Sequence, residues 1–185
     1  MILFINACVR KESRTKRLAD CLLKKLNGEV KEVNLEKENI LPLDNKTLDL
    51  RTKLGEAKNF DNPVFDYAKD FAKADTIVIA APFWDLSFPA SLKCYIEAIN
   101  IIGLTFEYSS DGIPYGLCNA KKLYYVTTSG GKIFNDEYGF GYIKSLCNNF
   151  YGIKEVSCIK AENLDIIGSD VENILRSAEK EIQSL

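Results

Sequence analysis

No histidine occurs among the 185 residues of this chain, and its absence excludes several catalytic classes. A Ser-His-Asp triad, a Cys-His pair, a histidine general base and a histidine-bearing zinc site all require an imidazole. The chain also lacks a C-x-x-C pair, so its six cysteines indicate neither a zinc site nor an iron–sulfur cluster. We therefore expect reduced cysteines that pack in the interior, and no bound metal.

The chain also lacks a strong excess of charge of either sign. Its 24 basic and 26 acidic side chains give a net charge of -2, which provides no field for nucleic acid or an anionic membrane. No apolar run reaches the length of a membrane span or of a secretory signal. We expect a cytoplasmic protein that binds neither nucleic acid nor membranes and folds as one domain over residues 1–185.

Short apolar runs alternate with segments of helical periodicity along the chain. Residues 2–6, the unbroken run ILFIN, are typical of a strand buried on both faces of a parallel sheet. Further strands are predicted at 29–34 (at an edge), 75–81, 122–128 and 154–160, and helices at 15–27, 64–73, 89–101, 138–150 and 170–182. This alternation predicts an α/β protein with an open, doubly wound sheet of five parallel strands, because a closed α/β barrel needs about 250 residues.

Two stretches interrupt the alternation. Residues 35–62 contain several helix breakers around one short helix and form a longer connection than a crossover requires. A segment of this kind often covers a site or a partner subunit. Residues 104–117 contain two aromatic, β-prone pieces around S-S-D-G, which predicts a hairpin.

The loop after the first strand leads directly into a helix and forms the first candidate site. Ser13 or Thr15 would cap that helix, and hydroxyls and first-turn amides together could cradle an anion. Five of the eight residues from 10 to 17 are basic, which is unfavourable at a helix N-terminus unless an anion is bound there. A capped helix with solvated charges is the alternative. The chain has neither a G-x-G-x-x-G motif nor a P-loop lysine motif, which argues against a dinucleotide fingerprint and a nucleoside triphosphatase.

Two further loops follow predicted strands. Pro82, Phe83 and Trp84 lie at the crevice where open α/β sheets bind ligands, and aromatic side chains there favour a flat ligand. The alternative is that they fill a core or an interface. The T-S-G-G motif at 128–131 would let a ligand approach backbone amides, and a plain turn is its alternative. Three loops at one edge of a sheet carry more weight than any single loop.

Together these motifs resemble the flavodoxin-like quinone reductase family, and most closely the FMN-dependent NADH-azoreductases, over nearly the whole chain. The resemblance lies in E-S-R-T, A-A-P-F-W-D-L-S-F-P-A-S-L-K-C-Y-I-E, G-L-T-F-E-Y-S-S-D-G-I-P-Y-G-L and T-T-S-G-G. It implies a flavodoxin-like sandwich whose five long strands lie in the order 2-1-3-4-5, with helices on both faces and the hairpin at 104–117.

The resemblance also implies roles for particular residues. The FMN phosphate would be held by Ser13, Arg14 and Thr15, with Arg10 nearby. The flavin ring would be lined by Pro82, Phe83, Trp84 and Asp85, and its pyrimidine end would contact Ser129, Gly130 and Gly131. A substrate pocket at a homodimer interface would contain Tyr108 and Phe150. No side chain is assigned a catalytic role, because the resemblance implies that flavin N5 carries the chemistry.

The function implied by the resemblance is two-electron, ping-pong reduction of quinones and of azo or nitroaromatic compounds, with NADH or NADPH as the donor. Two alternatives use the same cofactor, namely an NAD(P)H-dependent FMN reductase that releases reduced FMN, and a one-electron carrier like flavodoxin. A net charge of -2 offers a carrier little electrostatic docking surface, which favours the enzyme. A scaffold that has lost its cofactor is a third alternative.

Overall fold

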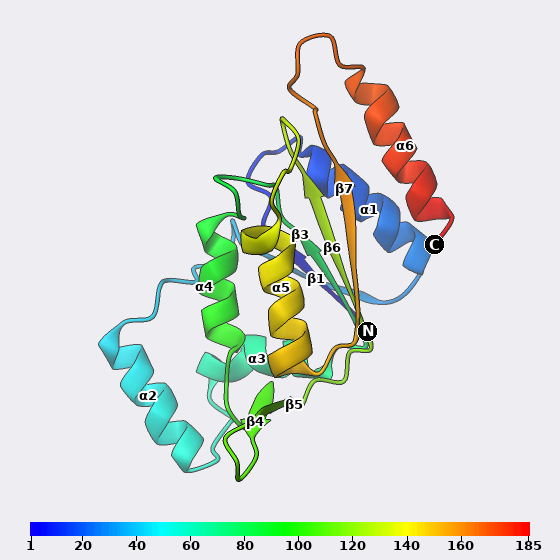
Figure 1. The fold of residues 1–185 in the computed structure, drawn as a ribbon. Coiled ribbons are helices and arrows are strands. Elements are labelled where there is room, and N and C mark those ends of the chain that lie inside the picture. The colour runs from blue at the N-terminus through cyan, green and yellow to red at the C-terminus, as the bar shows by residue number, and fades with distance from the viewer.

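Five parallel strands form the central sheet of the computed structural model, which describes residues 1–185 (Figure 1). They are β1 (Ile2–Asn6), β2 (Val30–Asn34), β3 (Thr76–Ala80), β6 (Lys122–Thr128) and β7 (Glu155–Ala161). Their spatial order is β2-β1-β3-β6-β7, which confirms the order predicted for the five long strands and the edge position of the second.

Helices cover both faces of this sheet (Figure 1). One face carries α1 (Arg14–Leu26) and α6 (Val171–Gln183), and the other carries α3 (Asp66–Lys73), α4 (Ala90–Ile99) and α5 (Tyr142–Leu146). The strands are buried on both faces because alternate residues enter two separate cores. In β1, Leu3 and Ile5 pack with α3, α4 and α5, whereas Ile2 and Phe4 pack with α1 and α6.

Local sequence signals fix the ends of α1. The Ser13 hydroxyl accepts a hydrogen bond from the backbone N–H of Lys16, as expected of an N-cap. Asn27 follows the helix with φ 48°, and asparagine is one of the few residues that tolerate this left-handed conformation. The Ser13 cap therefore sets where α1 begins, and with it the position of the candidate anion site.

The helix predicted at 138–150 forms as three consecutive helical segments. An α-helical turn, α5, is flanked by π-helical turns at Glu137–Gly141 and Cys147–Tyr151. In the first π turn, Gly141 donates its N–H to the carbonyl oxygen of Asp136, 2.8 Å away and five residues back. A Cβ on Gly141 would lie 3.2 Å from that oxygen, so glycine permits the wider turn.

The two irregular stretches also take the predicted forms. Residues 35–62 contain one main helix, α2 (Asn45–Glu56), which buries no side chain completely. The hairpin consists of β4 (Phe106–Tyr108) and β5 (Pro114–Gly116), paired antiparallel. The hairpin lies at the amino end of the sheet. Asn119, which follows the hairpin, donates its N–H to the carbonyl oxygen of Ala72, which precedes β3.

All six cysteines are free, and burial dominates the environment of most of them. Burial raises the pKa of the Cys118, Cys147 and Cys158 thiols to about 12, so these thiols stay protonated near neutral pH. These three cysteines therefore lie in surroundings that suit packing residues, as expected from the sequence. No helix is both long enough and apolar enough to cross a bilayer.

Replacing Gly116 by alanine tests the packing of the hairpin. An added Cβ would lie 2.1 Å from the carbonyl carbon of Tyr151, in backbone that cannot move aside as a flexible side chain can. We expect the variant to lose at least ~3 kcal/mol of unfolding free energy in urea titrations, at the upper end of overpacking costs. Gly55→Ala is the matched control, because nothing lies within 4 Å of its added Cβ. Gly55 lies in the last turn of α2, where alanine should raise stability by up to about 1 kcal/mol. A Gly116 variant as stable as this control would contradict the packing.

Candidate functional site

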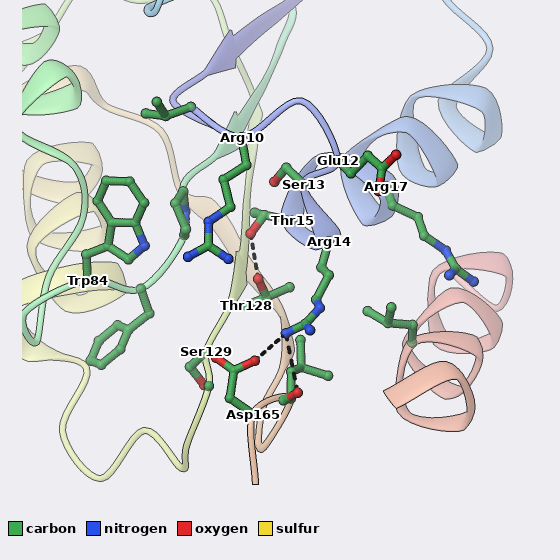
Figure 2. Close-up of a pocket in the computed structure, with 16 residues that line it drawn as sticks. Arg10, Glu12, Ser13, Arg14, Thr15, Arg17, Trp84, Thr128, Ser129 and Asp165 are labelled. Carbon is green, nitrogen blue, oxygen red and sulfur yellow. Dashed lines mark hydrogen bonds and ion pairs between the residues drawn. The ribbon is translucent and has the colours of Figure 1, made fainter. Parts of the chain in front are cut away.

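A cavity of about 700 Å³ opens at the carboxyl end of the sheet (Figure 2). Its walls come from all three predicted loops and from a fourth segment after β7. The lining segments are 9–10, 12–15 and 17, then 82–84, 128–130 and 164–165, together with Leu175 on α6. Ligand sites usually have volumes of roughly 300–1,000 Å³ and occur at this edge of open α/β sheets.

One end of the cavity is suited to an anion. Ser13 caps α1, and an α-helix provides no internal acceptor for the N–H groups of its first residues, here Arg14 and Thr15. No acidic residue occupies the first turn of α1. Free amides at the positive end of a helix dipole form a binding site for a phosphate or carboxylate.

Most of the basic side chains of this segment already have acidic partners within the chain. Lys16 pairs with Asp20 at 2.8 Å, Arg17 with both Glu172 and Glu179 at 2.7 Å, and Arg14 with Asp165 at 2.7 Å. The number of basic residues alone is therefore weaker support for a bound anion than the sequence suggests, because acidic partners neutralise three of the five charges. Arg10 and Lys11 have no ion pair, and only Arg10 of these two lines the cavity.

The Arg17 guanidinium is used entirely in ion pairs with Glu172 and Glu179. Hydrogen bonds from its guanidinium lower the pKa of the Glu172 carboxyl to about 2, so that carboxylate remains ionised at any pH where the protein is handled. In Figure 2 the Arg17 side chain extends toward α6, whereas the Arg10 guanidinium points into the cavity. Arg10 is thus the basic side chain of this segment that is available to a ligand.

The opposite wall of the cavity is aromatic. Pro82, Phe83 and Trp84 line it, and the Trp84 side chain is 38% exposed. The chain then turns sharply, with left-handed φ angles of 50° at Asp85 and 65° at Leu86. Asp85 does not line the cavity, so the structure places it in the turn that presents Trp84.

The third loop contributes backbone to the cavity. Ser129 and Gly130 line it, but Gly131 does not. Lys132 lies over the ring of Phe134, 5.6 Å from its centre, and does not reach the cavity. The part of this loop that faces a ligand is therefore small and largely uncharged.

Two residues of the site with hydrogen bonds across it were given no role of their own in the sequence analysis. Thr128 shares a buried hydrogen bond with Thr15, with 2.6 Å between the hydroxyl oxygens, which ties the start of α1 to the end of β6. Asp165 lies in the loop after β7 and binds Arg14. Its position after the last predicted strand, at the same sheet edge as the other loops, was the signal that could have identified it.

Tyr108 and Phe150 lie away from this cavity. Phe150 stacks on Phe106, with ring centres 4.5 Å apart. The Tyr108 ring packs edge-to-face with the same Phe106 ring, with ring centres 5.6 Å apart. Tyr108 and Phe106 both belong to β4, so Tyr108 and Phe150 lie at the hairpin. Figure 1 shows that hairpin, β4 and β5, at the amino end of the sheet. Within one chain they cannot form a pocket with Trp84, so their role in a substrate pocket requires a second copy and stays a prediction.

The architecture and the cavity together define an α/β protein built to bind a flat, anionic ligand such as a mononucleotide. The sequence matches the model of the flavodoxin-like fold over residues 1–185. It is 40% identical to FMN-dependent NADH:quinone oxidoreductase 2 of Clostridium acetobutylicum, over 95% of this chain and 92% of that protein. A relative of the same name from Clostridium perfringens strain 13 is 38% identical over 98% of this chain and 96% of its own.

A solved structure agrees with these relatives. The azoreductase from Bacillus anthracis str. Sterne superposes with a TM-score of 0.85 at 25% identity, covering 99% of this chain and 96% of that one. The chain therefore belongs to the flavodoxin-like family, among the FMN-dependent NADH:quinone oxidoreductases.

The buried Thr15–Thr128 bond is testable by a double-mutant cycle. Thr15→Val leaves the Thr128 hydroxyl buried without its partner, which should cost about 1–2 kcal/mol in urea unfolding. Thr15→Val combined with Thr128→Val removes both hydroxyls, so the double variant should lose less than the sum of the single losses. Strict additivity of the two losses would show that the hydroxyls do not interact.

Proposed function

We propose that this protein is an FMN-dependent NADH:quinone oxidoreductase whose cofactor occupies the cavity at the carboxyl end of the sheet. The observation that carries the proposal is the arrangement of a free helix N-terminus opposite an aromatic wall within one cavity of about 700 Å³. These features fit the two parts of FMN, a phosphate and a planar ring. The names of relatives that are about 40% identical over nearly the whole chain support the same cofactor.

The residues divide between the two parts of FMN. Ser13, Arg14 and Thr15 would hold the phosphate through the Ser13 hydroxyl and the first-turn amides, and Arg10 would add the positive charge. Pro82, Phe83 and Trp84 would line the ring, with Asp85 holding the turn that presents them. Ser129 and Gly130 would meet the pyrimidine end, with Gly131 shaping the loop behind them.

Bound FMN would supply the redox chemistry, a two-electron, ping-pong transfer from NADH or NADPH to a quinone, azo or nitroaromatic acceptor. The protein would hold the cofactor, shield it from water and stabilise charge that develops on it. Trp84 and Phe83 exclude water from one side of the site and offer an apolar surface to planar molecules. The Gly130 backbone N–H, which has no partner within the chain, would stabilise negative charge that develops near it, whereas the Ser129 N–H already donates to the carbonyl oxygen of Ala161. None of these tasks needs an imidazole, which explains how the site works without histidine.

We propose further that the chain forms a homodimer. Helix α2 and the segment before it expose Leu41, Leu48 and Leu50, and the hairpin exposes Ile113 and Tyr115. Groups of exposed apolar side chains are typical of a surface covered by another subunit. In such a dimer, Tyr108 and Phe150 of one copy could line the substrate pocket of the other copy.

Anaerobic absorption spectroscopy tests the proposed reaction. The purified protein, loaded with FMN, should lose its visible flavin absorption when NADH is added without an acceptor, and regain it when menadione follows. Recovery of the spectrum while the flavin stays with the protein on gel filtration distinguishes the oxidoreductase from an FMN reductase that releases its product. Bound flavin that NADH does not reduce would favour a flavodoxin-like carrier, and absence of flavin binding would contradict the proposal.

Arg10 provides a test of the phosphate end. Arg10→Gln removes the unpaired cation of the cavity, so the Kd for FMN should rise roughly tenfold, the equivalent of about 1.4 kcal/mol. The Kd for riboflavin, which lacks the phosphate, should stay the same. Lys11→Gln is the matched control because Lys11 is equally basic but does not line the cavity. Equal effects of the two substitutions would argue for general charge attraction rather than a contact.

A further inference from the structure

Asp165 contacts two parts of the site that are far apart in the sequence. Its Oδ1 accepts a hydrogen bond from Arg14 Nη1 at 2.7 Å, and the same nitrogen donates to the carbonyl oxygen of Leu164 at 3.3 Å. Arg14 is the first residue of α1, so Asp165 is attached to the phosphate end of the cavity. Figure 2 shows this pair beside Ser129, at the far side of the cavity from Trp84.

The other contact of Asp165 is with the loop after β6. The Asp165 N–H donates to the carbonyl oxygen of Gly130 at 2.9 Å, and the Leu164 N–H donates to that of Ser129 at 3.2 Å. Asp165 Oδ2 lies only 2.5 Å from the position that a Cβ on Gly130 would occupy. The Asp165 carboxylate therefore packs against the Gly130 backbone, in the space that a side chain at residue 130 would fill.

These contacts make the 164–165 segment a brace between the two ends of the cavity. Its main-chain N–H groups bind the carbonyl oxygens of Ser129 and Gly130, and the Asp165 carboxylate binds Arg14. The buried Thr15–Thr128 bond fixes the last residue of β6 to α1. Beyond that point Ser129 and Gly130 leave the strand, and Asp165 joins them to α1 through Arg14. The side chains of Arg14 and Asp165 are 40% and 67% exposed, and an ion pair with that exposure adds little to fold stability. Its effect is expected in the geometry of the site instead.

We propose that Asp165 is a positioning residue which, through Arg14 and the Gly130 backbone, holds the 129–130 segment in place against the ring of the bound cofactor. This inference rests on the proposed function, since it concerns the ring end of an FMN site. It assigns the Arg14 side chain to Asp165 rather than to the phosphate. It also predicts that loss of the brace affects ring binding, whereas loss of a phosphate contact affects only ligands with a phosphate.

The test compares FMN with riboflavin in four variants. Asp165→Asn keeps the shape of the side chain and removes its charge, and Arg14→Gln removes the other partner. Each should raise the Kd for FMN and for riboflavin by the same factor, about three- to tenfold, with the melting temperature unchanged. The double variant should bind no more weakly than either single variant. Asp70→Asn is the control, because it breaks a similar pair, Lys31–Asp70 at 2.6 Å, between β2 and α3.

The reduction potential of bound FMN gives a second readout that a merely structural pair would not move. A displaced Gly130 N–H would stabilise developing negative charge less well, so the potential should become more negative in Asp165→Asn and stay unchanged in the Asp70 control. Tighter FMN binding with unchanged riboflavin binding would mean that Asp165 opposes the phosphate, which overturns the proposal. A change in FMN binding alone, or no change with either flavin, overturns it as well. Failure of the wild-type protein to bind either flavin would instead overturn the proposed function, and this inference with it.

Discussion

Parallel pairing of β1, β3 and β6 is the constraint on which the rest of the structure depends. Parallel strands cannot be joined by tight turns, so each one continues into a crossover and all carboxyl ends emerge at one edge of the sheet. The register of these strands brings Arg10, Trp84, Gly130 and Asp165 around one cavity although they span most of the chain. The loops supply chemistry, but the buried strands determine which loops meet.

The strands, the hairpin and three of the four cavity loops could be predicted from the sequence because their signals are local. Apolar runs such as residues 2–6 and the serine cap of α1 need only neighbouring residues to act. The charge partners could not be predicted in this way. Whether Arg14 is free for a ligand depends on Asp165, 151 residues away, and that contact exists only after β7 has been added to the sheet. The π-helical turns around α5 escaped prediction because a helical pattern does not reveal which hydrogen bond the backbone will choose.

The basic residues at the start of α1 would serve two different purposes, ion pairing within the protein and binding of an anion. A basic segment before and within α1 suggests attraction of an anion, yet most of its cations stabilise contacts between α1, α6 and the loop after β7. Pairing these charges keeps the cavity from acquiring a large positive potential. Under the proposed function, recognition of the FMN phosphate would rely on oriented amides and one free guanidinium, which are more selective for geometry than a diffuse positive field is.

Helix α2 is attached to the rest of the protein in an unusual way. It buries no side chain completely, and Arg51 anchors it by donating to the carbonyl oxygens of Glu97 and Asn100 at the end of α4. A helix of this length is marginal alone in water, and opening it exposes little additional apolar surface. Its amides should therefore exchange hydrogen with solvent through local opening, at a free energy well below that of the sheet. In a single subunit, α2 can therefore melt and re-form while the strands and the cavity stay folded, and cover by a second subunit would stabilise it.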